Sequence, residues 1–272
     1  MTRITLFSFL LIFSTNNSKA CSIAYYIDEV SGNIFAGNNE DYWYDVKEYM
    51  QFNPAKDNKL AHLWYGWDKF AQGGINAKGL FFDAAVTPEQ KIPESYQNPN
   101  GRNVGADLLS VCDNVDEAIA YLEQEKIAVS NGHLFLGDAN GNAVVIEWIK
   151  GEKKLITLQN NRLIATNYLL SDTTVGYYPC IRYQSIEKKI NELDKRKQTV
   201  DLRTFVNVMA VAVQIPQTNE EGKKGGTLYS TFVNLKTLEL VIAPRMNNNK
   251  VMKFDLNTEF AKSKRQKIKL YK

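Results

Sequence analysis

The amino-acid sequence predicts an α+β domain in which groups of strands and groups of helices form separate layers. Short apolar segments bounded by Gly, Asn and Asp, a pattern typical of strands and hairpin turns, occur near both ends and in the middle of the chain. Segments with helical spacing of apolar residues lie between them. The resulting order of strands, helices, strands, helices and strands fits a layered α+β domain better than alternating βαβ units.

Composition and charge fit one globular domain. The chain has 272 residues, of which 44% are hydrophobic and 23% charged, and its formal net charge is +3. Arg3 and Lys19 lie in the predicted signal segment, so the rest of the chain is almost balanced in charge. This balance argues against a nucleic-acid-binding protein, which needs a concentrated basic face. We interpret the basic tail, 262–272, as a solvated chain end.

Residues 1–20 are predicted to be an export signal. The segment begins with the positively charged Arg3, and an apolar run follows over 4–13. This run has the length of a signal core and is too short to span a bilayer. Ser18 and Ala20 place small residues before a cut at Cys21. We therefore expect a single exported domain over 21–272, periplasmic or secreted, without stable membrane insertion.

The elements of this domain are predicted in chain order from turn chemistry and periodicity. A first hairpin has strands at 21–27 and from 34 onward, and further strands are expected at 60–66, 69–75 and 79–86. A surface loop over 87–101 precedes helices at 103–112 and 114–126, a hairpin over 133–151 and a strand at 161–168. Helices at 178–197 and 201–213, a hairpin over 226–244 and a strand at 252–256 complete the chain.

The first hairpin suggests a chemical site. Its two open ends lie side by side, so Cys21 and Asp41 are expected to be neighbours. If cleavage follows Ala20, Cys21 carries a thiol and a free α-amine with a reference pKa of about 8. One residue then supplies both a nucleophile and a base, which is the N-terminal-nucleophile strategy. It needs no histidine, so His62 and His133 are interpreted as structural, and their spacing indicates no metal site.

Five motifs in the expected order carry a family resemblance. They are 37-GNNED-41, 74-GINAKGL-80, 138-DANGNAVVIE-147, 166-TN-167 and 181-IRY-183. With them the sequence resembles the choloylglycine hydrolase and penicillin V acylase group of linear amide C–N hydrolases. The resemblance implies the four-layer αββα sandwich of N-terminal-nucleophile hydrolases, a small-molecule N-acyl amide substrate, and no metal or organic cofactor.

The resemblance also implies roles for four residues. Cys21 corresponds to the nucleophile, and Asp41 to the carboxylate that orients the new N-terminus. Asn167 corresponds to an amide that holds the oxyanion or the substrate, and Arg182 to an arginine that stabilises negative charge near the thiol. These four residues are the predicted catalytic set.

Two departures from the family pattern concern the substrate. The family's first arginine is replaced by Asn38, which removes one positive charge near the nucleophile. The family's second oxyanion asparagine has no match, since Ala85 and Val86 occupy its place and only Asp83 is nearby. A backbone N–H is expected to serve there instead. Asn38 and Asp83 are the predicted substrate-binding residues.

Several alternatives stay open at this point. An acyltransferase of the same fold would pass the acyl group to an amine, and a lipid-anchored surface protein would have no catalysis. Lipidation at Cys21 favours an aliphatic residue three positions earlier, where this chain has Ser18, so a free terminus is preferred. Cys112 and Cys180 are either buried thiols or one disulfide. The particular N-acyl substrate and a homo-oligomeric state also stay open.

Overall fold

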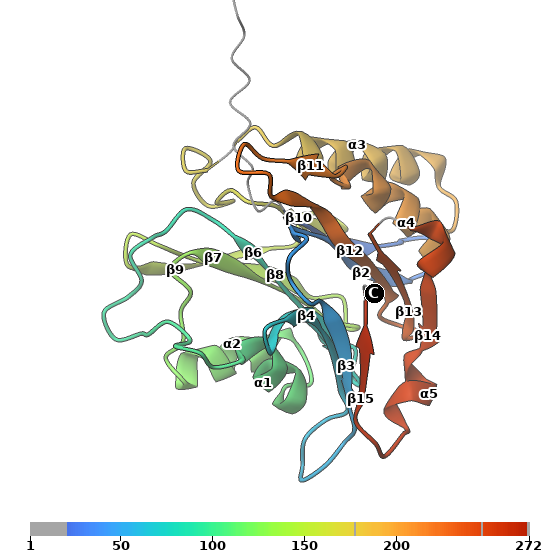
Figure 1. Ribbon diagram of the computed structural model, residues 1–272, viewed down its shortest axis with the longest axis horizontal. Coiled ribbons are helices and arrows are strands. Elements are labelled where there is room, and N and C mark those ends of the chain that lie inside the picture. The colour runs from blue at the N-terminus through green and yellow to red at the C-terminus, as the bar shows by residue number, and fades with distance from the viewer. Residues whose placement is uncertain (1–20, 177, 246, 271–272) are drawn as a thin grey trace, which may run out of the picture.

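Two antiparallel sheets pack face to face between two pairs of helices (Figure 1). This computed structural model describes residues 21–176, 178–245 and 247–270, so the predicted signal segment 1–20 lies outside the described residues. The predicted α+β class and the four-layer αββα arrangement are confirmed.

The first sheet has seven strands and carries both ends of the first hairpin. Its order is β10-β1-β2-β12-β13-β14, and β11 pairs with β12 beside this path. The strands are β1 (Ser22–Ile27), β2 (Ile34–Trp43), β10 (Arg162–Ala165), β11 (Gln217–Thr218), β12 (Lys224–Asn234), β13 (Glu239–Pro244) and β14 (Met252–Asp255). The long β12 pairs with β2 over nearly its whole length, so a segment from late in the chain covers the strand that follows the first turn.

The second sheet has eight strands in the order β15-β3-β4-β5-β6-β7-β8-β9. They are β3 (Tyr49–Asn53), β4 (His62–Trp67), β5 (Phe70–Asn76), β6 (Phe81–Val86), β7 (Gly132–Gly137), β8 (Ala143–Ile149), β9 (Glu152–Thr157) and β15 (Gln266–Lys269). The sequence did not predict β3, β9 or β15. The two sheet edges, β9 and β15, are mostly exposed and rich in lysine, so they lack the apolar alternation that reveals a half-buried strand.

Helices cover the outer face of each sheet (Figure 1). The helices are α1 (Val104–Val111), α2 (Val115–Gln124), α3 (Ile181–Arg196), α4 (Leu202–Met209) and α5 (Leu256–Phe260), with short 3-10 turns at Ala210–Ala212 and Asn248–Lys250. Asn114 caps the beginning of α2, since its Oδ1 accepts the Glu117 N–H at 3.0 Å, and the Glu117 side chain in turn accepts the Asp113 N–H at 2.8 Å. Among the described residues, no helix has the length and apolar character needed to cross a membrane.

Three hydrophobic clusters hold the layers together. The largest lies between the sheets and includes Tyr25, Tyr65 and Phe135. A second joins α1 and α2 to the eight-stranded sheet, and a third joins α3 and α4 to the seven-stranded sheet. Cys112 belongs to the second cluster, and Cys180 is buried near α3. All three cysteines are free thiols, so Cys112 and Cys180 are buried thiols and do not form a disulfide.

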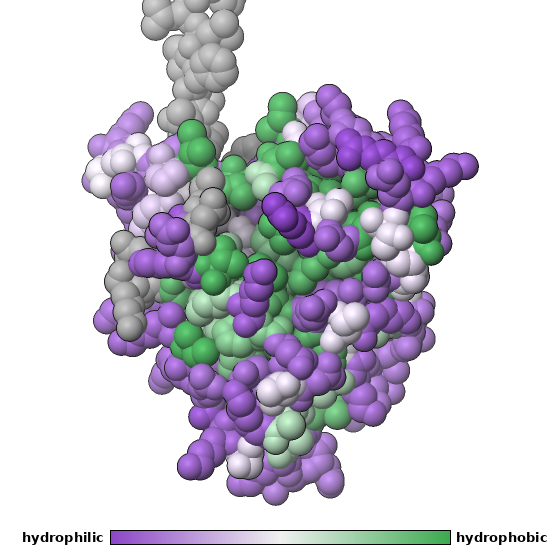
Figure 2. Space-filling view, turned by 90° about the vertical axis from the view of Figure 1, so that its right-hand side faces the viewer, coloured by the Kyte–Doolittle hydropathy of each residue, from purple (hydrophilic) through white to green (hydrophobic). Residues whose placement is uncertain are grey.

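One face of the molecule is mainly hydrophilic (Figure 2). Figure 2 shows the face that carries β14 and α5, where hydrophobic side chains gather between hydrophilic ones. A shallow hollow of about 540 Å³ on this side lies between α4 and the β13–β14 pair. It contains none of the predicted site residues.

Candidate active site

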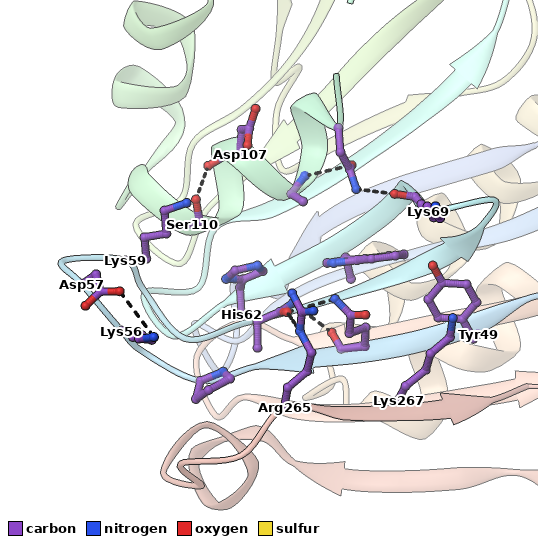
Figure 3. A pocket seen from close by; sticks show the side chains of 16 residues that line it. Tyr49, Lys56, Asp57, Lys59, His62, Lys69, Asp107, Ser110, Arg265 and Lys267 are labelled. Carbon is purple, nitrogen blue, oxygen red and sulfur yellow. Dashed lines mark hydrogen bonds and ion pairs between the residues drawn. The ribbon is translucent and has the colours of Figure 1, made fainter. Parts of the chain in front are cut away.

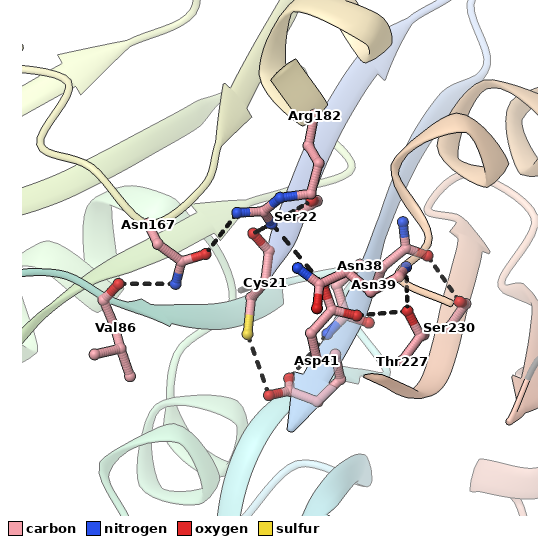
Figure 4. A network of polar contacts seen from close by, with 12 residues as sticks. Cys21, Ser22, Asn38, Asn39, Asp41, Val86, Asn167, Arg182, Thr227 and Ser230 are labelled. Atoms are coloured by element: carbon pink, nitrogen blue, oxygen red, sulfur yellow. Dashed lines mark hydrogen bonds and ion pairs between the residues drawn. The ribbon is translucent and has the colours of Figure 1, made fainter. Parts of the chain in front are cut away.

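The structure brings the four predicted catalytic residues together at the beginning of β1 (Figure 4). Strand β1 lies between β10 and β2, so the predicted hairpin is confirmed, and its register pairs Ser22 with Asn39. Cys21 immediately precedes this pairing and is only 4% exposed. The predicted nucleophile therefore lies at the end of a central strand, where the flanking strands fix its position.

Arg182 connects the beginning of β1 to the loop after β10. Its Nη1 donates to the Cys21 carbonyl oxygen at 2.5 Å and to Ser22 Oγ at 2.9 Å. Its Nη2 donates to Asn167 Oδ1 at 3.1 Å. The side chain extends from the first turn of α3, so the helix layer above the sheet holds the guanidinium at the site. The arginine thus fixes Cys21 and Asn167 relative to each other.

Asn167 is held at both ends of its amide. While Oδ1 accepts from Arg182, Nδ2 donates to the Val86 carbonyl oxygen at 2.8 Å. The side-chain amide therefore bridges the two sheets, because Val86 ends β6 and Asn167 follows β10. An amide nitrogen carries two hydrogens, and the bond to Val86 uses one of them. Donation of the other to a substrate oxyanion stays a prediction.

Asp41 has one bonded and one unbonded oxygen. Its Oδ1 accepts the Thr227 hydroxyl at 2.5 Å, whereas its buried Oδ2 has no hydrogen-bond partner among the described residues and lies 3.9 Å from Arg182 Nη1. Burial raises the pKa of Asp41 to about 7, although Thr227 and Arg182 act in the opposite direction. A buried carboxylate oxygen normally has a donor, and a free α-amine on Cys21 is the kind of donor that Asp41 lacks.

The Cys21 thiol contacts a residue that sequence reasoning missed. Its Sγ–H donates to Oε1 of Glu40 at 3.3 Å, and Glu40 is only 3% exposed. Burial and then the charges of Glu40 and Asp41 raise the pKa of the thiol well above its usual value, while a hydrogen bond from the Asp41 backbone N–H acts the other way. The thiol is therefore protonated at neutral pH and needs a group that takes its proton before or during attack.

The two predicted substrate-binding residues lie behind Glu40. Asn38 is wholly buried; its Nδ2 donates to Glu40 Oε2 at 3.3 Å and its Oδ1 accepts from the Thr231 hydroxyl. Asp83 is also wholly buried, and its Oδ2 accepts the Tyr65 hydroxyl at 3.1 Å. Neither side chain lines the hollow at Cys21. Direct contact of either residue with a substrate stays a prediction.

A hollow of about 270 Å³ opens at the thiol. Its walls combine apolar and polar side chains, with Tyr42, Trp67, Val86 and Val129 on the apolar side. Cys21, Glu40 and Asp41 form its acidic part. Such a hollow suits a compact apolar group bound beside a nucleophile, since ligand sites are mostly apolar with a few placed polar groups.

A larger hollow, of about 720 Å³, lies elsewhere on the molecule, beside α1 and the β3–β15 edge (Figure 3). Its walls include Lys59, His62, Lys69, Arg265 and Lys267. It is therefore mainly cationic, and no cysteine lines it. His62 belongs to this hollow and not to the thiol site.

Within the described ranges, no three His, Cys, Asp or Glu side chains are grouped to hold a metal ion.

Comparisons with known proteins address the family and the fold of the chain. The family model described as acyl-coenzyme A:6-aminopenicillanic acid acyl-transferase matches residues 29–243. Penicillin V acylase from Pectobacterium atrosepticum is 32% identical over 110 residues, which are 35% of this chain and 29% of that relative, so the match spans under a third of the relative's length.

Two solved structures share the fold. A variant of conjugated bile acid hydrolase from Clostridium perfringens has 16% identity and a TM-score of 0.72, with 91% of this chain and 96% of that chain covered. Penicillin V acylase from Agrobacterium tumefaciens has 17% identity and a TM-score of 0.70, with 91% and 90% covered. The resemblance inferred from the sequence motifs is confirmed.

Proposed function

Because this chain belongs to the acyl-coenzyme A:6-aminopenicillanic acid acyl-transferase family, we propose that it is an exported amidohydrolase with an N-terminal cysteine nucleophile. It cleaves a linear, non-peptide C–N amide through a thioester acyl-enzyme. The observation that carries this proposal is the thiol of Cys21 at the hollow, with Asp41, Asn167 and Arg182 assembled around it. Removal of residues 1–20 gives Cys21 the free α-amine that completes the site.

The reaction follows from these positions. The sulfur of Cys21 attacks the amide carbonyl carbon, an S–C bond forms, and the thiol proton passes to a base at the site, for which the α-amine is available. Asn167 and a backbone N–H hold the oxyanion, and Arg182 adds positive charge close by. The C–N bond then breaks as the leaving amine takes the proton. Water attacks the thioester carbonyl, releases the carboxylic acid and restores the thiol.

The hollow favours a substrate with an apolar acyl group, because Trp67, Val86 and Val129 line it beside the thiol. Penicillin V acylase and conjugated bile acid hydrolase are the names of solved structures with the same fold. The proposed substrates are accordingly N-acyl amides, of which acylated penicillins and conjugated bile acids are two to be tested.

The description of the matching family favours a second candidate, an acyltransferase. It would use the same thioester, but an amine would attack in place of water. Product analysis of wild-type protein in the presence of competing amines separates the two reactions: a new amide indicates transfer, and only free acid indicates hydrolysis.

The proposal is tested by assaying processed protein on a panel of N-acyl amides, with Cys21→Ala and Cys21→Ser as variants. Both variants should lose turnover by at least about a thousandfold while keeping the wild-type melting temperature, because the nucleophile is lost and packing is nearly unchanged. Intact mass should show a chain that begins at Cys21 without a lipid adduct. Full activity of the alanine variant, or a diacylglyceryl mass on the terminus, would overturn the proposal.

A further inference from the structure

The larger hollow, beside α1 and the β3–β15 edge, carries positive charge that its own acids do not neutralise. Four cations in its walls form no ion pair among the described residues: Lys59, Lys69, Arg265 and Lys267. The two acids of the walls already have partners. Asp57 lies 3.7 Å from Lys56 of the same wall, and Asp107 pairs with Arg102 at 2.7 Å. Unmatched charges of one sign around a hollow concentrate ions of the opposite sign.

Two of these cations come from the basic tail that the sequence suggests is a solvated chain end. In the structure, 266–269 forms β15, which pairs with β3 and places Lys267 opposite Gln51. The ammonium of Lys267 lies 3.2 Å from the centre of the Tyr49 ring. Arg265 directly precedes the strand and lines the hollow with it. This part of the tail therefore builds one wall of the hollow.

Arg265 is fixed by its inner nitrogen and keeps its outer nitrogens available. Its Nε donates to Asn53 Oδ1 at 3.0 Å, and the same oxygen accepts Gln51 Nε2 at 2.9 Å. Its two Nη groups form no hydrogen bond with any described residue. Figure 3 shows the side chain reaching from the end of β15 toward His62. A guanidinium held in this way presents paired donors, which match the oxygens of a phosphate or a carboxylate.

Lys69 is presented by a turn that has a fixed conformation. It lies between β4 and β5 with a φ of 71°, in the left-handed region that residues with side chains seldom adopt. Asn103, at the beginning of α1, holds this turn from outside. Its Nδ2 donates to the Lys69 carbonyl oxygen at 2.7 Å, and its Oδ1 accepts the Ala71 N–H at 3.0 Å. The position of Lys69 at the hollow is thus set by the packing of α1.

The positive charge of the hollow acts on His62. This histidine is only 7% exposed, and its Nδ1 lies 2.9 Å from the Leu60 carbonyl oxygen. Burial lowers the pKa of His62, and the charges of Lys59 and Arg265 lower it further, while Leu60 and Asp107 act in the opposite direction. His62 can therefore report any negative charge that enters the hollow.

We propose that this hollow binds a ligand that carries two or more phosphate groups. Its cations project from three places, the loop after β3, the β4–β5 turn and β15, so a ligand must present negative oxygens on several sides. A phosphate group has three acceptor oxygens and almost two charges, whereas a carboxylate has two oxygens in one plane. Two phosphates carry about three to four charges, which balance the four cations.

The ligand can come from two sources, a free diphosphate compound or the phosphate headgroups of a lipid surface. The volume of about 720 Å³ is large enough for a compact headgroup or a small organic diphosphate. No cysteine lines the hollow, and it shares no residue with the hollow at Cys21. The inference is therefore independent of the proposed amidase function.

Binding of inorganic pyrophosphate to the processed protein, measured by calorimetry at low ionic strength, tests this proposal. We expect saturable binding to one site, weakened about tenfold or more by Arg265→Gln and by Lys267→Gln, because each removes a charged donor. Lys264→Gln is the matched control. It removes the same charge from the same tail, but Lys264 does not line the hollow, so affinity should stay at the wild-type value. Melting temperatures identify any variant that fails to fold.

The two histidines of the chain provide a second measurement. In an NMR titration, pyrophosphate should raise the pKa of His62, because it brings negative charge beside the ring. His133 lies against Glu147 in another part of the molecule and should not respond. Arg265→Gln should raise the pKa of His62 even without pyrophosphate, since one of the charges that lower it is gone.

Two further probes define the ligand. Citrate should bind more weakly than pyrophosphate, and equal affinity would overturn the assignment to phosphate. Sedimentation with phosphatidylcholine vesicles that contain cardiolipin, lost in Arg265→Gln, supports a lipid source; pyrophosphate binding without vesicle binding supports a free ligand. The proposal is overturned if neither pyrophosphate nor vesicles bind, or if Lys264→Gln weakens binding as much as Arg265→Gln, which would indicate a general effect of charge.

Discussion

Two buried glutamates in this molecule have opposite environments. Glu40 on β2 accepts from a thiol and an amide, and burial raises its pKa to about 8. Glu147 on β8 is wholly buried, and burial alone would raise its pKa as well. Instead, hydrogen bonds from His133 and Ser171 outweigh burial, and the pKa of Glu147 is below its usual value.

The difference shows that the hydrogen-bond donors, and not burial itself, decide whether a buried carboxyl is charged. Glu147 accepts the backbone N–H of Leu170 at 2.7 Å and of Ser171 at 2.9 Å, and His133 Nδ1 lies 3.1 Å from it. It therefore stays ionised and anchors the loop that carries Asn167. Glu40 accepts only from the Cys21 thiol and the Asn38 amide, so burial prevails and its carboxyl exchanges a proton near pH 8.

The largest effect should come from removing the structural glutamate. Glu147→Ala leaves two backbone N–H groups and His133 without their acceptor, and we expect a loss of about 3–5 kcal/mol in the free energy of unfolding. Glu147→Gln keeps one acceptor oxygen and should lose less. Urea denaturation measures both. A loss below about 1 kcal/mol in the alanine variant would contradict the anchoring role assigned to this residue.

A smaller effect should appear in the pH dependence of stability. Between its unfolded pKa of 4.5 and its folded pKa of about 8, Glu40 holds a proton only in the folded state. Its contribution is therefore complete below pH 4.5 and is lost as pH rises toward 8. We expect the wild type to lose about 2–4 kcal/mol between pH 5 and pH 8 from this residue.

Glu40→Gln should flatten that slope, measured by urea denaturation at the two pH values. Asp41 contributes in the same direction up to its pKa of about 7, so a residual slope should remain. Glu147 acts in the opposite sense, because a lowered pKa gives stability that is lost as pH falls. A slope that is identical in the wild type and in Glu40→Gln would show that Glu40 is ionised throughout.

The sequence predicted the parts of this site that depend on local signals. Turn chemistry over 28–33 and the alternation on either side predict the hairpin that places Cys21 beside Asp41. Arg182 and Asn167 were found through motifs, and their meeting at the thiol requires β10 to pair with β1 and α3 to pack on the seven-stranded sheet, which no local pattern reveals.

Glu40 was missed for a physical reason. In the sequence it belongs to a run of polar residues that reads as the end of a turn. Its burial comes from β12, which pairs with β2 from late in the chain, with Tyr229 opposite Glu40. The available signal was a charged residue within the 37–41 motif, two positions beyond Asn38, which replaces the family's first arginine. A non-local strand pairing decides its environment, so composition and periodicity could not.

The smallest effect should come from Asp83, and it tests how far the comparison of the two glutamates extends. Asp83 is wholly buried, and burial together with the charge of Glu40 raises its pKa well above its usual value. The raised pKa favours the protonated form of Asp83. Asp83→Asn resembles a protonated Asp83, so it should move the pH midpoint of Cys21 alkylation by less than about half a unit. A shift of one unit or more toward lower pH would mean that Asp83 is ionised. The proton near the thiol would then be shared by the two carboxyls, and Glu40 alone would not set the pH dependence of the site.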